Sequence, residues 1–124
     1  KVIKMRRKNA EQMSQKLSGV KGLLPPKPQS NYHIYQMYTV RVKEGKEMRD
    51  NLAKHLAERG VSTKVYFYPV HLTHFYKSEL KYRVKLPVTE EISEQVLTLP
   101  MYPTLTTKEI GYIVDQTKAF FLQR

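Results

Sequence analysis

The sequence contains no cysteine, only five isolated glycines and no long apolar run. Without cysteine, the chain can form no disulfide and offers no thiolate for catalysis, which is compatible with a cytoplasmic protein. Isolated glycines exclude the glycine-rich loops that cradle phosphate groups. No apolar stretch approaches the roughly 18 residues that a membrane-spanning helix needs. These absences exclude thiol enzymes, P-loop nucleotide binding and a transmembrane helix.

Acidic residues are also scarce, with 11 Asp and Glu against 22 Lys and Arg, so the net charge is +11. The excess is concentrated in residues 1–27, where Glu11 is the one acidic side chain among eight basic ones. Such a segment suits a polyanionic partner, for example nucleic acid or a phosphorylated ligand. Solvated helix faces, or surfaces that meet another domain, are commoner sources of the same charge. Charge alone therefore leaves nucleic-acid binding as an alternative hypothesis.

The first part of the chain has a helical pattern followed by a proline-rich connector. Apolar residues recur at helical spacing in residues 1–17, namely Ile3, Ala10, Met13 and Leu17. Ser18 and Gly19 end this pattern, and three prolines within residues 23–30 exclude helix there. We therefore expect an amphipathic helix and then an extended connector.

Residues 32–42 alternate as a strand does, and a short helical pattern follows them. The alternation places three side chains on one face: Tyr38, Val40 and Val42. Residues 46–59 are expected to form a helix that ends at Gly60, where a left-handed backbone costs least. His55 lies near the apolar side of this helix, which favours a packing role for it.

Two more strands are expected later in the chain. Residues 61–68 again alternate, and burial preference predicts that Val65 and Phe67 belong to the core. Pro69 lacks a backbone donor and ends regular pairing. Residues 97–99 can form a short third strand before the next proline.

The last helix has the clearest start signal in the sequence. Thr106 is the expected N-cap, and Glu109 stands at the capping-box position three residues later. Leu105 and Ile110 can form the flanking hydrophobic staple. The buried stripe of this helix is expected to consist of Ile110, Ile113, Val114, Thr117 and Phe121. A shorter helical pattern over residues 88–96 precedes it.

These elements favour an α+β fold, with a small three-stranded, largely antiparallel sheet and helices on one face. We expect the short third strand to insert between the first two. Nothing in the sequence covers the other face of the sheet, so a further domain is expected to do so. The chain also starts at Lys1 in a helical pattern with no targeting segment, which suggests a piece of a longer protein.

Residues 64–77 are the first place to look for function, because a loop rich in polar-tipped rings directly follows an expected strand. Hydrogen-bonding side chains suited to a sugar, phosphate or carboxylate gather there: Tyr66, Tyr68, His71, His74 and Tyr76. The H-x-x-H spacing of two of them has no neighbouring carboxylate or thiol, so no metal site is expected. Glu90 and Glu91 have the position of an acidic first turn of a helix, where they interact with its dipole. The residues thus indicate a binding surface and no catalytic group.

Six motifs follow one another in a distinctive order. They are Y-H-I-Y (32–35), R-D-N-L-A-K-H-L-A-E-R-G-V (49–61), Y-P-V-H-L (68–72), F-Y-K (75–77), L-P-V-T-E-E-I-S-E-Q-V-L-T-L-P-M-Y-P-T-L-T (86–106) and E-I-G-Y-I (109–113). This order resembles the C-terminal part of the DegT/DnrJ/StrS family of pyridoxal-phosphate-dependent sugar aminotransferases. The resemblance covers about residues 1–122 and is most specific in residues 86–112.

The resemblance implies the small C-terminal domain of an aspartate-aminotransferase-type fold. Residues 1–124 would form one unit, with 1–20 as the lead helix from a missing N-terminal large domain and 31–124 as the small domain. The family moves an amino group, usually from glutamate, to a nucleotide-linked keto sugar, and it works as a cytoplasmic homodimer. Its Schiff-base lysine and cofactor-ring aspartate belong to the large domain, and Lys64 matches no motif. The chain alone is therefore expected to bind no pyridoxal phosphate and to be inactive.

The Y-P-V-H-L motif carries over the site residues, since in such enzymes it reaches the mouth of the active site. His71 is the leading substrate-binding residue by this resemblance, with Tyr68 and Tyr76 as further ones. The sequence then departs from the family, because T-H-F-Y-K stands where many relatives have a glutamine-proline pair before the tyrosine. No substrate role is therefore expected for His74. The alternative function is a basic nucleic-acid-binding or regulatory module, in which tyrosines stack on bases.

Overall fold

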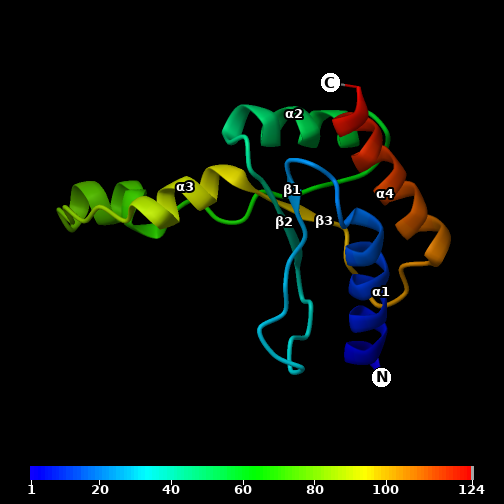
Figure 1. Ribbon diagram of the computed structural model, residues 1–124. Coiled ribbons are helices and arrows are strands. Elements are labelled where there is room, and N and C mark those ends of the chain that lie inside the picture. Colours follow the sequence, from blue (N-terminus) through cyan, green and yellow to red (C-terminus); the bar gives the residue numbers. More distant parts are fainter. Residues whose placement is uncertain (124) are drawn as a thin grey trace.

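The computed structural model describes residues 1–123, which form four α-helices, three strands and two shorter helical turns (Figure 1). In chain order the elements are α1 (Val2–Leu17), β1 (Leu23–Leu24), β2 (Tyr38–Val42), α2 (Lys46–Ala57), η1 (Val70–Leu72), η2 (Phe75–Glu79), α3 (Pro87–Gln95), β3 (Val96–Leu99) and α4 (Thr107–Leu122). The four α-helices and the third expected strand are therefore confirmed, and the α+β class with them. The first expected strand is confirmed over residues 38–42 and wrong for 32–37, which form a turn and loop.

The three strands form an antiparallel sheet in the order β1-β2-β3. At the outer edge of β3, the backbone of Thr98 exchanges two hydrogen bonds with Lys64, at 2.7 and 3.0 Å. The third strand thus lies between β2 and the segment at Lys64, as expected. The outer strand β1 comes from the segment that the sequence predicts to be an extended connector.

The predicted strand over residues 61–68 is wrong, because only Lys64 in it pairs with the sheet. Val65 is 46% exposed and Phe67 is 68% exposed, so neither belongs to the core. The reason is the partner available on β3. With Lys64 opposite Thr98 in antiparallel register, Phe67 would face Gln95, which is the last residue of helix α3. An alternating pattern has no strand to pair with there, and the chain leaves the sheet.

Helices α1, α2 and α4 pack on one face of the sheet and form a single core with it (Figure 1). The face of β2 that meets them carries fully buried side chains: Tyr38, Val40 and Val42. Helix α1 contributes Ala10, Met13 and Leu17 to the core, whereas Ile3, at the start of the same apolar pattern, is 45% exposed. On the opposite face of the sheet, the hydroxyl groups of Thr39 and Thr98 lie 2.8 Å apart.

The start of α4 has the predicted capping box. The backbone N–H of Thr106 donates to Glu109 Oε2 at 2.7 Å, and the backbone N–H of Glu109 donates to Thr106 Oγ1 at 3.2 Å. Leu105 and Ile110 are both buried, as a hydrophobic staple requires. The hydrogen bonds from Thr106 lower the pKa of the Glu109 carboxyl. The sequence therefore located this helix start to the residue.

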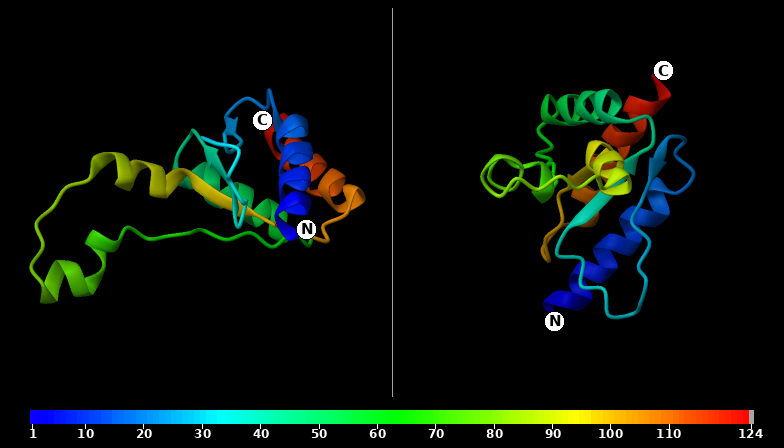
Figure 2. Two further views of the ribbon diagram at one scale, coloured as in Figure 1. Left: turned by 90° about the horizontal axis from the view of Figure 1, so that it is seen from below. Right: turned by 90° about the vertical axis from the view of Figure 1, so that its left-hand side faces the viewer.

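Residues 65–88, which we call the arm, extend away from the remaining residues 1–64 and 89–123, which we call the body (Figure 2). The arm contains η1, η2 and the first two residues of α3. Of its residues only Pro69 is buried. Its exposed large apolar side chains are Val65, Tyr66, Phe67, Tyr68, Val70, Phe75, Leu80, Tyr82, Val84, Leu86 and Val88. Within residues 1–123, each helix is too short or too polar to cross a membrane.

Candidate functional site

His71 lies where the arm turns back toward helix α3. Pro69 precedes it, and the Leu72 N–H donates to the Pro69 carbonyl at 3.0 Å, which closes the short turn η1. This turn directs the imidazole to the first turn of α3, where Nε2 lies 2.9 Å from Glu90 Oε1. The His71 side chain is only 10% exposed, although most of the arm is open to solvent. The arm therefore holds this ring in one place.

Glu90 makes a second hydrogen bond that fixes its own position. Its Oε1 accepts from the backbone N–H of Leu86 at 3.1 Å, so the same oxygen binds both the ring and the start of α3. The hydrogen bond from His71 and then that from Leu86 lower the pKa of the Glu90 carboxyl. The first-turn position expected for Glu90 is confirmed. Its bond to a histidine 19 positions earlier was not anticipated.

Two arginines of the body hold α3 against the sheet. Arg49 of α2 is 4% exposed, and its Nη1 donates to the carbonyls of Ser93 at 3.3 Å and Val96 at 3.1 Å. Its Nε donates to Asp50 at 2.6 Å. Arg41 of β2 pairs with Glu91 at 3.4 Å and donates to Gln95 as well. The element that carries Glu90 is thus fixed on the body, while His71 belongs to the arm.

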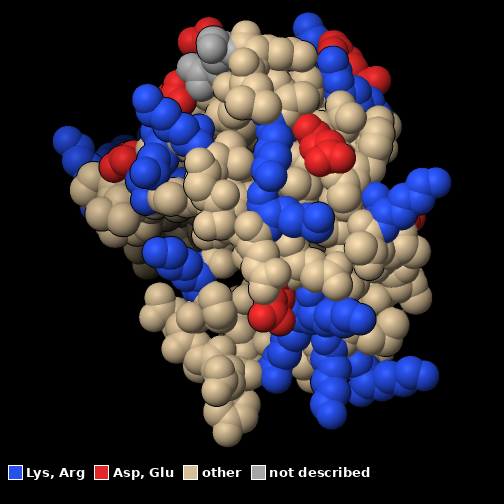
Figure 3. Space-filling view, turned by 45° about the vertical axis from the view of Figure 1, so that its right-hand side comes forward, with Lys and Arg blue, Asp and Glu red and all other residues tan. Residues whose placement is uncertain are grey.

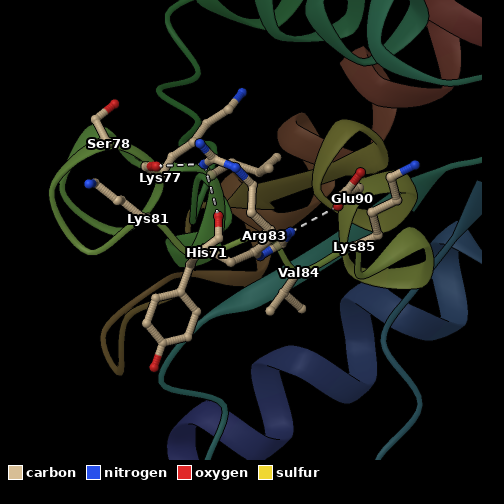
Figure 4. A pocket seen from close by; sticks show the side chains of 10 residues that line it. His71, Lys77, Ser78, Lys81, Arg83, Val84, Lys85 and Glu90 are labelled. Atoms are coloured by element: carbon tan, nitrogen blue, oxygen red, sulfur yellow. Dashed lines mark hydrogen bonds and ion pairs between the residues drawn. The ribbon is translucent and has the colours of Figure 1, made fainter.

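A cavity of about 600 Å³ lies beside His71 and has a basic lining (Figure 4). The basic side chains around it are Lys77, Lys81, Arg83 and Lys85. The acid in the lining, Glu90, already accepts the two hydrogen bonds described above. Arg83 Nη1 donates to the Lys77 carbonyl at 3.0 Å, which ties the two sides of the arm's tip together. Four cations around one cavity suit an anionic group such as a phosphate.

The structure does not bring all three predicted substrate residues to this cavity. Tyr68 is 66% exposed and lines a separate cavity of about 490 Å³, together with Phe67 and Arg49. Tyr76 packs edge-on against Phe75 and Tyr82, with ring centroids 5.5 and 5.6 Å away. Of the three, only His71 lines the basic cavity.

The basic residues of the arm are the part of this site that sequence reasoning missed. Residues 77–85, K-S-E-L-K-Y-R-V-K, hold four bases and one acid. That run is a usable signal, since it lies close to the Y-P-V-H-L motif. The charge count alone did not single out this run, because residues 1–27 carry a larger excess of positive charge.

His55 and part of the basic N-terminal segment have structural roles. His55 Nε2 lies 3.0 Å from the Gln116 carbonyl, and its ring packs edge-on against Phe120, which confirms the packing role. Arg7 Nε donates to the His33 carbonyl at 2.8 Å. Arg6 donates to two further carbonyls of the 33–36 loop, at 3.2 and 3.1 Å. On the face drawn in Figure 3, Lys and Arg side chains lie in separate groups, the largest at its lower end.

The residues present do not fit pyridoxal phosphate by themselves. Lys64 lines a cavity of about 200 Å³, which is smaller than the roughly 300–1,000 Å³ typical of ligand pockets. The lysines beside His71 line a larger cavity. No aspartate lines that cavity, the one at Tyr68 or the one at Lys64. A ring aspartate and a Schiff-base lysine are therefore not brought together in any of these three cavities. Across residues 1–123, no group of three or more His, Asp or Glu side chains is placed to hold a metal ion.

Comparison with known proteins gives one consistent result. Residues 1–118 match the family described as the DegT/DnrJ/EryC1/StrS aminotransferase family. The chain is 32% identical over 114 residues to the dTDP-4-dehydro-2,3,6-trideoxy-D-glucose 4-aminotransferase of Saccharopolyspora spinosa, which covers 92% of this chain and 29% of that protein. It is 32% identical over 120 residues to the pleiotropic regulatory protein of Geobacillus stearothermophilus, covering 94% of this chain and 31% of that one.

A solved structure gives the same answer for the fold. The aminotransferase TlmJ from Streptoalloteichus hindustanus superposes with a TM-score of 0.87 at 30% identity, over 98% of this chain and 32% of that one. The chain therefore spans about a third of the length of the relatives that it matches.

Proposed function

Because the chain belongs to the DegT/DnrJ/EryC1/StrS aminotransferase family, which depends on pyridoxal phosphate, we propose that it is the substrate-side domain of a sugar aminotransferase. In this proposal it is a C-terminal part of a longer enzyme that acts on nucleotide-linked keto sugars. Two observations support that division: the relatives are about three times as long, and no aspartate lines the cavities beside His71, Tyr68 or Lys64. The name of the Saccharopolyspora spinosa relative, which specifies a dTDP-linked sugar, supports the substrate class.

The observation that carries the proposal is the basic cavity beside His71. A nucleotide-linked sugar presents a diphosphate next to hydroxyl groups. The four cations of the cavity suit the diphosphate, because charge-assisted hydrogen bonds to phosphate oxygens are strong and directional. His71, held by Glu90, then lies beside the anion and can hydrogen-bond a sugar group. Tyr68 and Tyr76 stay predictions as substrate residues.

The chain's own part in the reaction is binding and orientation. Pyridoxal phosphate, bound by the rest of the enzyme, supplies the electron sink that amino transfer needs. The arm would fix the substrate by its phosphates and hold the sugar in one orientation, so that the keto carbon faces the amino group. The apolar side chains of the arm would exclude water once a second surface covers them.

That second surface would belong to the large domain or to the partner subunit of a homodimer. An arm with so many exposed apolar side chains is seldom left in water, because large exposed apolar patches mark interaction sites. We place the lead helix in residues 1–20 and the small domain in residues 31–124. We also propose a cytoplasmic location.

The test uses the full-length protein encoded by the gene. The gene should encode a lysine-bearing domain upstream of Lys1, and the purified enzyme should convert a dTDP-linked 4-keto sugar with L-glutamate as donor. His71→Ala should raise the substrate KM or lower kcat by about tenfold, as expected for the loss of one substrate hydrogen bond. His74→Ala is the matched control, because that exposed histidine contacts neither the cavity nor Glu90. A His71→Ala enzyme with unchanged KM and kcat would contradict the role of His71.

The isolated 124-residue chain provides a second test. It should form no covalent adduct with pyridoxal phosphate and show no transaminase activity. Covalent binding of the cofactor at Lys64 or another lysine of the chain, detected by absorbance and peptide mapping, would contradict the proposed division of labour.

The alternative function, nucleic-acid binding through residues 1–27, is not supported. Arg6 and Arg7 already hydrogen-bond backbone carbonyls of the 33–36 loop, and the matching family consists of aminotransferases. Oligonucleotide binding should therefore be weak at physiological salt. Tight binding that weakens steeply as salt is added would favour the alternative.

A further inference from the structure

The hydrogen bond between the arm and α3 determines which nitrogen of His71 is left for a ligand. Nε2 lies 2.9 Å from a Glu90 oxygen, and among residues 1–123 no group hydrogen-bonds Nδ1. An ionised carboxylate only accepts hydrogen bonds, so Nε2 must carry the hydrogen that joins them. In the neutral ring, Nδ1 is then a hydrogen-bond acceptor.

Glu90 is well placed to impose this state. The same oxygen is held by the Leu86 backbone N–H at 3.1 Å, so the carboxylate has little freedom to rotate away. Its side chain is 37% exposed, while that of His71 is 10% exposed. The lowered pKa of the Glu90 carboxyl agrees with a group that stays ionised. Lys77, Lys81, Arg83 and Lys85 line the same cavity and can only donate, so none can replace Glu90 as the acceptor.

We propose that Glu90 is a positioning residue that holds His71 in its Nε2–H tautomer, so that Nδ1 accepts a hydrogen bond from a hydroxyl group of the bound sugar. The inference rests on the proposed function for the identity of the ligand, but not for the state of the ring. It assigns complementary tasks to the two kinds of side chain in the cavity. The cations donate to phosphate oxygens, which accept, and His71 accepts from a sugar hydroxyl, which donates.

This arrangement makes the site selective in a way that the basic residues alone cannot. A ligand that offers only acceptors beside its diphosphate would face the Nδ1 lone pair and leave it unpaired. An unpaired polar group in a desolvated site weakens binding markedly. The site should therefore prefer a sugar with a free hydroxyl at the position facing His71 over the corresponding deoxy sugar.

The state of the ring can be tested on the 124-residue chain itself by ¹⁵N NMR of the histidine side chains, at a pH where the rings are neutral. The wild-type chain should show His71 as the Nε2–H tautomer with a slowly exchanging ring N–H. Glu90→Ala should abolish that protection and mix the tautomers. Glu90→Gln should largely retain both signals, because its amide oxygen can still accept. Glu94→Ala removes an exposed carboxylate one turn along the same helix and should change neither signal.

The role of Glu90 in binding is tested in the full-length enzyme by a double-mutant cycle. With the dTDP-linked 4-keto sugar as substrate, Glu90→Ala should lower kcat/KM about tenfold, and Glu90→Gln should recover to within about threefold of wild type. Because Glu90 acts through His71, the His71→Ala/Glu90→Ala variant should be no worse than His71→Ala alone.

The possible failures are distinguishable. A wild-type His71 with the Nδ1–H tautomer, or one unaffected by Glu90→Ala, overturns the inference whatever the enzyme does. Additive losses in the double mutant overturn it as well, because Glu90 would then act independently of His71. If the NMR results are as expected but His71→Ala has no effect on kinetics, the proposed substrate role of His71 fails and the positioning of the ring stands.

Discussion

The body and the arm both carry many large apolar side chains, but these are buried in the body and exposed in the arm. In the body, apolar residues of three helices and the sheet form one core, and side chains such as Leu56 and Leu97 are 0% exposed. In the arm, Leu80 and Leu86 are 48% and 41% exposed, and Pro69 is the one buried residue. An apolar side chain stabilises a fold only where other atoms cover it. The arm's exposed apolar side chains therefore contribute little to the stability of the body.

The two regions also use their polar side chains differently. In the body, polar groups complete the fold: Tyr38 Oη lies 2.8 Å from Ser14 Oγ, and burial raises the pKa of Tyr38 to about 12. In the arm, four cations surround an open cavity, and only Arg83 has a hydrogen-bond partner there. Polar side chains such as Ser14 and Tyr38 thus complete the fold of the body, whereas the arm presents cations that can bind a ligand.

The largest expected effect contrasts one leucine from each region. Leu56→Ala in α2 should lower the free energy of unfolding by about 2–5 kcal/mol, because it leaves a cavity in the core. Leu80→Ala in the arm should change it by less than about 0.5 kcal/mol, since that side chain is half exposed. Urea unfolding of both variants measures the difference. Equal losses would mean that the arm packs on the body in solution.

The next effect concerns the junction of the two regions. Arg49→Met should cost about 1–3 kcal/mol, because the carbonyls of Ser93 and Val96 lose a buried donor. Arg83→Met in the arm is the control and should leave the unfolding midpoint unchanged, since the arginine is exposed. Thermal unfolding followed by circular dichroism gives both values. A neutral Arg49→Met would show that α3 is held by its other contacts.

A smaller effect is expected at the cap of α4. Thr106→Ala should destabilise the body by about 1 kcal/mol, because the Glu109 N–H loses its side-chain acceptor. The exposed Thr104→Ala is a control outside the capping box. Substrate binding by the full-length enzyme should be unaffected by either change. A Thr106→Ala variant as stable as wild type would assign the helix start to the hydrophobic staple.

The smallest expected effect is the change of stability with pH that two glutamates with a lowered pKa cause. They are Glu109 in the capping box and Glu90 beside His71. A carboxyl whose pKa is lower in the folded state adds stability above its unfolded pKa, which is about 4.5. That contribution is lost as the pH falls through the folded value. Glu109→Gln should therefore flatten the decline of Tm between about pH 6 and pH 3.

Glu90→Gln should remove the response of the His71 NMR signals to titration of the Glu90 carboxyl over the same pH range, with little change in Tm, because Glu90 connects the arm and not the core. The comparison of the two regions would be weakened if Glu90→Gln shifted Tm as much as Glu109→Gln does.

Local signals in the sequence predicted much of the body. Thr106 and Glu109 gave the start of α4 because a capping box involves only neighbouring residues. Gly60, with φ of +74°, adopts the left-handed backbone that the end of the second helix was expected to need. The strand predicted from the alternation in residues 38–42 forms because β2 has a partner strand on each side. The cap and the glycine depend on residues close in the chain, and the strand depends on neighbouring strands that are present in the sheet.

The same reasoning failed for residues 65–68, where the pattern of alternation is just as clear. Val65 and Phe67 are both exposed, and in the register set by Lys64 and Thr98 Phe67 would face Gln95, where α3 ends and β3 has not yet begun. For the candidate site, the sequence pointed to His71 but not to its partner. Glu90 had the features of an ordinary first-turn acid, and only the return of the arm places it 2.9 Å from the ring.

The sequence by itself determined the helices, the central strands, the cap of α4 and the motifs of the family, because each depends on residues close in the chain or on their order. Only the tertiary structure decided which apolar residues are buried and which polar groups meet. Burial requires covering atoms, and within residues 1–123 most of the arm's apolar side chains lack them. The His71–Glu90 bond and the basic cavity depend on the path of a loop that no local pattern specifies.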